Sequence, residues 1–282
     1  MVTPAGRKTP APTEVVSRAE GILLTVAYDG GPFSGFVPQP GQRTIAGELL
    51  RAIRTMRPDV AEVRGASRTD AGVHARGQRV AFDADGVIPP RGWVLGLAAH
   101  LPEEIAVRAA SRVDPGYTPR FRSRGKRYVY SILCDPVRDP FVERVAVRVP
   151  VTLDRERLAT EARAAVGTHD FAAFRGARDE RDVTVRTVRR FDVLEDLADP
   201  RLLRLVVEGD GFLYHMVRIL AGTLLDVGLG RVPEGAIARG IELRDRHVLG
   251  RTAPPEGLAL DEVFLDDAGR EAWPSPERSP FS

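Results

Sequence analysis

The residues best suited to chemistry lie in the loop 68–74, whose sequence is RTDAGVH. Two strand-like segments, 60–65 and 78–83, flank this loop, so Asp70 stands at a turn between two predicted strands, with an arginine and glycines beside it. Loops held by a rigid scaffold frequently carry function, and an ionised, shielded carboxylate can act as a nucleophile. The alternative is an Asx turn, in which Asp70 bonds its own backbone. The local pattern alone favours the Asx turn. Only features elsewhere in the chain make a functional role for Asp70 the better interpretation.

A second candidate is Arg218, which lies in the mostly apolar segment 212–222. An arginine on an apolar helix needs an anionic partner or a path to water. Ala221 and Gly222 follow three and four residues later on the same helical face and leave space beside the guanidinium. Pairing with a catalytic carboxylate would keep that carboxylate ionised, whereas snorkelling to solvent would have no functional meaning, and the segment alone does not decide between them.

A third candidate is the segment KRYVY at 126–130, because alternation along a strand places Tyr128 and Tyr130 on one face. One interpretation is a ring that stacks on a nucleobase and a phenol that passes a proton. The other is a pair of core tyrosines, which is expected to hold for at least one of them.

The rest of the sequence contains no other familiar catalytic or ligand-binding motif. The chain has no P-loop, complete GxGxxG, GxSxG or Cys/His metal cluster, and no second acid-centred motif stands out for a glycosidase-type pair. We therefore expect no cofactor and no metal. His74 and His215 lie near the motifs and are interpreted as structural.

The cations of this chain are almost all arginine. Lysine occurs only at Lys8 and Lys126 among 41 basic residues, which leaves 39 arginines, and the net charge is +2. Genomic base composition is one explanation and phosphate or base contact is the other. The basic connector 114–125 and the cluster 120–127 are interleaved with aromatic residues, an arrangement that suits RNA.

Periodicity predicts the elements that must position these residues. The first set is a strand, a helix capped by Thr44, two strands, a helix and a strand, at 21–28, 45–56, 60–65, 78–83, 90–100 and 105–113. This order is that of a ferredoxin-like unit. The second set partly repeats the order as a strand, a short strand, a helix, a hairpin, a helix and a strand, at 127–134, 145–149, 155–166, 183–193 with 202–208, 213–227 and 258–265.

Both ends of the chain are predicted to be tails, at 1–20 and 268–282, around an N-terminal half at 21–113 and a C-terminal half at 114–267. Neither a secretory signal nor an apolar run near the about 20 residues of a membrane helix is present. Cys134 is the only cysteine, which fits a reducing compartment, so a cytoplasmic protein is expected.

Four blocks in this order resemble the TruA family of tRNA pseudouridine synthases: YDGGPFSG at 28–35, RTDAGVHA at 68–75, KRYVY at 126–130 and HMVR at 215–218. The resemblance covers about 23–265 and closes with PEGL at 255–258. Departures from the family pattern are Phe36-Val37 for Trp-Gln, Ser67 for glycine, Thr118-Pro119 for His-Ala and Ile219 for asparagine. None of them removes a charged or nucleophilic group.

The resemblance implies an α+β fold of two ferredoxin-like (RRM-like) halves, with joined, mainly antiparallel sheets and a central basic cleft. It implies isomerisation of uridine to pseudouridine in the anticodon stem-loop of tRNA, at family positions 38, 39 and 40, by a homodimer. A catalytically silent RNA-binding protein and a nucleoside hydrolase are the rival functions.

The family's site residues carry over one by one. Asp70 matches the nucleophile and Arg218 its partner. Tyr128 matches the ring that stacks on the target base and helps to remove the C5 proton. Leu258 matches an apolar wall of the pocket, and Arg68 matches the residue that enters the space vacated by the extruded base. Arg120 and Arg127, in the basic cluster, are expected to hold phosphates.

Overall fold

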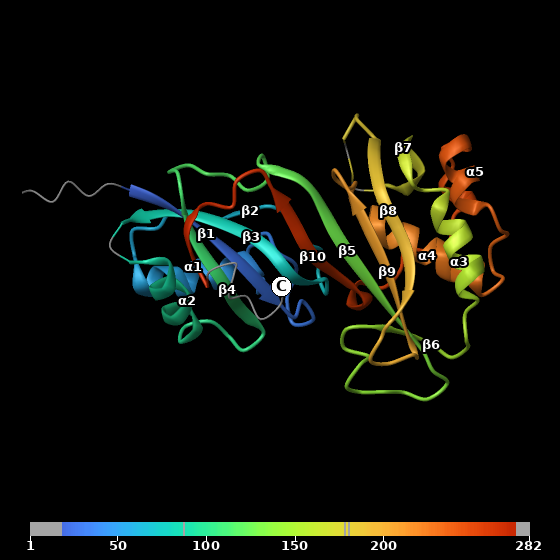
Figure 1. Ribbon diagram of the computed structural model, residues 1–282, viewed down its shortest axis with the longest axis horizontal. Helices are drawn as coiled ribbons and strands as arrows, with labels where there is room; N and C mark the ends of the chain where they lie inside the picture. The colour runs from blue at the N-terminus through green and yellow to red at the C-terminus, as the bar shows by residue number, and fades with distance from the viewer. Residues whose placement is uncertain (1–18, 87, 178, 180, 275–282) are drawn as a thin grey trace, which may run out of the picture.

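The computed structural model describes residues 19–86, 88–177, 179 and 181–274. Figure 1 shows an elongated molecule in which one continuous sheet runs through an N-terminal part and a C-terminal part, each with its own helices. The strands are β1 (Ala19–Tyr28), β2 (Arg64–Gly65), β3 (His74–Asp85), β4 (Ile105–Val113), β5 (Ser123–Cys134), β6 (Val147–Val149), β7 (Gly167–Asp170), β8 (Val185–Glu195), β9 (Leu202–Gly209), β10 (Leu258–Leu265) and β11 (Arg270–Trp273). The helices are α1 (Ile45–Met56), α2 (Pro90–Ala98), α3 (Arg155–Arg163), α4 (Met216–Gly228) and α5 (Ala236–Leu243).

The sheet order is β11-β4-β1-β3-β10-β5-β9-β8-β7, with β2 paired to β3 and β6 paired to β5. The pairs β3–β10 and β5–β6 are parallel, and the other pairs in the described residues are antiparallel. The expected α+β class with a mainly antiparallel sheet is therefore confirmed.

The strand β10 joins the two parts of the sheet. It pairs in parallel with the start of β3 at His74 and Ala75, and antiparallel with β5 across its other edge. Leu260 lies opposite Tyr128 in that second pairing. A strand from the end of the chain thus holds the loop before β3 beside the middle of β5, which is how residues far apart in sequence come together.

Helix α1 follows from its local sequence. In α1, Ile45, Leu49 and Ile53 recur at helical spacing and are buried, and the Thr44 hydroxyl accepts a hydrogen bond from Gly47 N at 3.3 Å. Capping and burial act together, so the helix begins and ends where the sequence predicts.

The predicted tails are both too long. Ala19 and Glu20 lie in β1, while residues 1–18 fall outside the described residues. At the other end, β11 pairs with β4, and the Ser111 hydroxyl donates to the carbonyl of Ala268 at 2.6 Å. The segment is polar, yet pairing with an edge strand satisfies its backbone groups. Residues 275–282 lie outside the described residues.

Candidate active site

Asp70 and Arg218 come together from the two parts of the sheet. Asp70 lies in the loop before β3 and Arg218 on the first turn of α4, and Arg218 Nη1 donates to Asp70 Oδ2 at 3.2 Å. Their side chains are 21% and 13% exposed, so the pair is largely shielded from water yet reachable. Within the described residues no backbone N–H donates to the Asp70 carboxylate, and the Asx-turn interpretation is wrong.

His215 is a second neighbour of this carboxylate that sequence reasoning left among the structural residues. Its Nε2 lies 3.3 Å from Asp70 Oδ2 and its ring stacks on Tyr214, with 3.8 Å between ring centres. The backbone of His215 is left-handed (φ 62°), which turns the ring toward the loop just before α4 begins. The spacing of three residues to Arg218 was the available signal.

The second anchor of Arg218 is a backbone carbonyl. Its Nε donates to Ala253 O at 2.8 Å, while the amide of Ala253 donates to the carbonyl of Arg218 at 2.9 Å. This approach is possible because Gly222 has no side chain, since a Cβ there would lie 1.8 Å from Arg251 O. Gly222 therefore makes room for the segment that orients the guanidinium, rather than for the guanidinium itself.

Gly222→Ala is expected to destabilise the protein by about 1–3 kcal/mol, the usual cost of overpacking, because the new methyl group meets backbone that cannot turn aside. The measurement is the thermal unfolding midpoint, with Gly211→Ala as the control, since a Cβ at Gly211 meets nothing within 4 Å. A Gly222→Ala midpoint equal to that of the control would contradict the close approach of the two segments.

A buried amide holds the loop that carries Asp70. Gln78 of β3 is fully buried, its Oε1 accepts from Ser67 N at 3.1 Å, and its Nε2 donates to Ser67 O at 2.8 Å. The hydroxyls of Tyr28 and Thr69 are 2.8 Å apart. These bonds fix the residues immediately before Asp70, so the position of the carboxylate is determined by β1 and β3.

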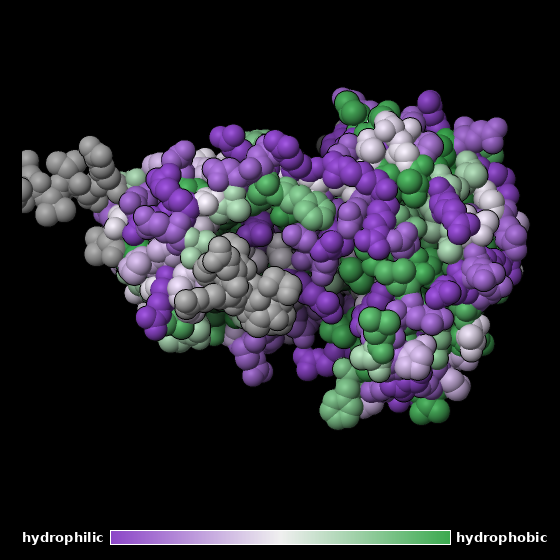
Figure 2. Space-filling model, in the orientation of Figure 1, coloured by the Kyte–Doolittle hydropathy of each residue, from purple (hydrophilic) through white to green (hydrophobic). Residues whose placement is uncertain are grey.

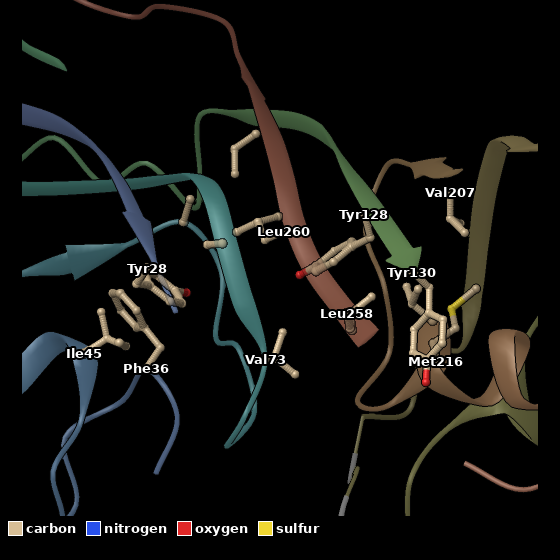
Figure 3. Packing of buried hydrophobic residues seen from close by; sticks show 14 of the residues in the cluster. Tyr28, Phe36, Ile45, Val73, Tyr128, Tyr130, Val207, Met216, Leu258 and Leu260 are labelled. Carbon is tan, nitrogen blue, oxygen red and sulfur yellow. The ribbon is translucent and has the colours of Figure 1, made fainter. Parts of the chain in front are cut away.

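Tyr128 lies in the cleft and Tyr130 in the core. Figure 3 shows the Tyr128 side chain projecting from β5 with its phenol oxygen directed toward the N-terminal part, whereas the Tyr130 oxygen points another way. The Tyr130 hydroxyl donates to Pro254 O at 3.0 Å. The Tyr128 ring meets Phe212 edge to face at 5.4 Å and its hydroxyl lies 2.9 Å from Ser67 Oγ.

The pKa of Tyr128 is raised to about 12, chiefly by burial; the hydrogen bond to Ser67 opposes the rise, and the negative charge of Asp70 adds to it. The phenol therefore carries its proton at neutral pH, and a base must take that proton before Tyr128 can accept another.

These groups line one cleft of about 880 Å³, within the size range of ligand sites. Arg68 and Arg120 are exposed on its lining, and Leu258 is buried at its wall. The charged residues of the lining are mostly cationic: Arg64, Arg68, Arg120, Lys126, Arg181 and Arg218, against Asp70 and Asp179. On the face in Figure 2, hydrophilic residues surround the junction between the two parts. The cleft is therefore suited to an anionic polymer.

Arg127 does not belong to this site, and the expectation that it holds phosphate is corrected. Its guanidinium bonds Asp261 at 2.6 Å, Glu262 at 2.5 Å and Glu208 at 3.3 Å. The reason is strand alternation, because the neighbour Tyr128 faces the cleft and Arg127 must face the other side of the sheet.

Alternation also places Lys126 on the cleft side of β5, whereas the sequence had placed it only within the basic cluster 120–127. Its Nζ donates to Ser67 Oγ at 3.2 Å. Burial, with a smaller contribution from the positive charges of Arg120 and Arg181, lowers the pKa of Lys126 to about 8. The two-residue spacing to Tyr128 was the signal that could have found it.

The described residues contain neither a metal-binding cluster nor a membrane-spanning helix. No group of three or more His, Cys, Asp or Glu side chains is arranged there to hold a metal ion. No helix in the same ranges is long and apolar enough to cross a membrane.

Known proteins resemble this chain over most of its length. A family model described as tRNA pseudouridine synthase matches residues 24–122 and 162–266. The tRNA pseudouridine synthase A of Geobacillus sp. (strain WCH70) is 39% identical over 247 residues, which are 87% of this chain and 98% of that protein. The protein of the same name from Bacillus licheniformis is 42% identical over 245 residues, or 86% and 98%.

Among solved structures, a chain of a Cbf5-Nop10-Gar1 complex covers 87% of this chain and 50% of its own length at 12% identity. The TM-score of that match is 0.39.

Proposed function

This chain belongs to the tRNA pseudouridine synthase family, and from that premise we propose that it isomerises uridine to pseudouridine in the anticodon stem-loop of tRNA with Asp70 as the nucleophile. The supporting observation is the meeting of Asp70, Arg218 and Tyr128 from three distant segments in one cationic cleft. Nothing is oxidised or reduced overall, because the N1–C1′ bond is exchanged for a C5–C1′ bond. An isomerase of this kind needs positioning and proton transfer above all.

Each cleft residue has a part in this proposal. Asp70 attacks either C1′ or C6, and both routes require an ionised carboxylate shielded from water. Arg218 stabilises and orients that carboxylate through a charge-assisted hydrogen bond. Tyr128 stacks on the extruded uracil against the apolar wall at Leu258, and Arg68 fills the gap that the base leaves.

The architecture has a corresponding proposal. We propose that residues 21–113 and 114–267 form two ferredoxin-like halves. The strand order β4-β1-β3-β2 supports this for the first half, and β10-β5-β9-β8 supports the same order for the second. The homodimer implied by the resemblance and the cytoplasmic location expected from the single cysteine also stay proposals. Sedimentation equilibrium with and without tRNA tests the dimer.

The test of the reaction uses tRNA whose uridines carry tritium at C5. Wild-type protein is expected to release the label to water as C5 joins C1′. Mapping pseudouridine along the product tRNA then tests the stem-loop assignment. Binding of tRNA without release would favour a silent RNA-binding protein, and free uracil would favour a hydrolase.

Affinity for tRNA is expected to fall steeply with salt, because cations in the cleft displace counterions from phosphates. Arg120→Ala should reduce the magnitude of the slope of log K against log[salt] by about 1, the change expected when one phosphate contact is lost. Arg127→Ala is the control and should leave the slope unchanged, since Arg127 is bonded to carboxylates on the other face. Equal slopes for wild type and Arg120→Ala would remove Arg120 from the interface. A reduced slope for Arg127→Ala would restore the original expectation for that residue.

A further inference from the structure

Two consecutive hydrogen bonds connect the Tyr128 phenol to Ser67 and then to Lys126, and neither has a part in the steps proposed above. Ser67 Oγ lies 2.9 Å from Tyr128 Oη, and Lys126 Nζ lies 3.2 Å from the same Ser67 Oγ. Ser67 and Tyr128 are only 7% and 8% exposed, and all three residues line the cleft that holds Asp70. The serine hydroxyl is thus the link between a phenol and an amine.

The position of this hydroxyl is fixed by the fold. Gln78 bonds both the amide and the carbonyl of Ser67, so the side chain starts from a clamped backbone. A group held this firmly between two proton-carrying side chains has the geometry that general acid–base catalysis requires.

We propose that Ser67 and Lys126 form a proton relay behind Tyr128, by which Tyr128 can accept the C5 proton of the isomerised base. The relay rests on the proposed function and adds to it the final acceptor of that proton. Tyr128 touches the base, whereas Ser67 and Lys126 act through it.

The step balances without a further reactant. Once C5 has bonded to C1′, the C5–H bond breaks and its electron pair forms the C5=C6 double bond. In exchange C6 gives up its π bond to N1, whose electron pair moves onto N1, or its bond to Asp70 if the carboxylate attacked C6. The proton goes to Tyr128 Oη while the phenol passes its own proton to Ser67 Oγ, and the serine proton passes to the neutral amine of Lys126. N1 of the base takes a proton from water. The ammonium group formed on Lys126 later returns its extra proton to the hydroxide that is left.

Electrostatics in the cleft suit an amine that starts neutral. Arg120 of the connector and Arg181 of the loop before β8 act electrostatically on Lys126. The other titratable groups that line the same cleft come from β2, from the catalytic loop, from the loop before β8 and from the start of α4: Arg64, Arg68, Asp70, Asp179, His215 and Arg218. Burial and the nearest arginines lower the pKa of Lys126 to about 8. Because only the neutral amine can accept a proton, C5–H cleavage should speed up as pH rises through that value and then level off.

The state of the amine can be measured directly, because the chain has only two lysines. Protein grown with lysine labelled at Cε should give two titrating NMR signals, and Lys126→Arg identifies the one from residue 126. A titration midpoint about two units below the usual lysine value is expected. A midpoint at the usual value would overturn the relay, whatever the enzyme proves to do.

The relay itself is tested by single-turnover tritium release at saturating protein between pH 6 and 9.5. Ser67→Ala and Lys126→Met should each slow release by about 100-fold, a typical loss for general acid–base catalysis, and lose the rise near pH 8. Both should enlarge the deuterium isotope effect at C5, because proton removal becomes slower than the other steps. Ser67→Thr keeps a hydroxyl and should keep most of the rate.

The readouts separate this proposal from a structural role and from the proposed function. Unfolding midpoints and tRNA affinity show whether a variant is intact, and a merely structural loss would not change the isotope effect. Wild-type pH profiles and isotope effects in both Ser67→Ala and Lys126→Met would overturn the relay alone. No release by wild type would overturn the proposed function, and the relay with it.

Discussion

Asp70→Asn is expected to lower the rate of tritium release from tRNA by at least about 10⁴-fold, the scale on which loss of a covalent nucleophile acts. The amide has the same size and shape as the carboxylate but carries no charge and attacks carbon poorly. The loop should keep its place, because Gln78 and Thr69 hold it through groups that the change does not touch. Binding of tRNA should therefore be retained.

Asp261→Asn is the matched control. It also removes the charge of an arginine-bonded aspartate, but that aspartate bonds Arg127 on the other face of the sheet. Its release rate should stay close to that of wild type. Release by Asp70→Asn at a rate near that of the control would exclude Asp70 as the nucleophile.

Arg218→Ala is expected to slow turnover by about 10²–10³-fold, the usual loss when one preorganised donor to a developing or reacting charge is removed. The carboxylate keeps His215 at 3.3 Å but loses the guanidinium and the orientation that it gives. Affinity for tRNA should change little, because this side chain is only 13% exposed.

Arg218→Lys separates charge from geometry. A lysine supplies a positive charge but cannot bond both Ala253 O and Asp70 through one planar group, as arginine does here. We expect it to recover only part of the lost rate. Full recovery would mean that charge alone matters, and near-normal turnover by Arg218→Ala would remove Arg218 from the mechanism.

Sequence patterns predicted the elements whose signals are local. The helix α1 and the strands β4 and β10 have the predicted bounds, because capping, periodic burial and alternation decide them within a few residues. The pairing of Asp70 with Arg218 was expected from the family resemblance, because the apolar helix alone left both an anionic partner and solvent open for the guanidinium. Even so, nothing in either segment said that β10 would bring them together.

What the sequence did not predict depends on long-range contacts or on finer geometry. β11 is only four residues long, and it pairs with the edge of β4 while Trp273 packs against the core. The spacing to Arg218 could have suggested that His215 lies near Asp70, but the left-handed backbone of His215 could not be read from the sequence. By contrast, strand alternation, which placed Tyr128, also puts Arg127 and Lys126 on opposite faces of β5. Their positions could therefore have been predicted from the sequence.

In this mechanism Asp70 does the chemistry and Arg218 acts through it. A double-mutant cycle under single-turnover conditions tests this most directly, with wild type, Asp70→Asn, Arg218→Ala and the double variant compared by tritium release from tRNA. We predict that the double variant is no slower than Asp70→Asn alone, because the guanidinium has no other catalytic role. Losses that multiply, or substantial release by Asp70→Asn, would contradict the claim.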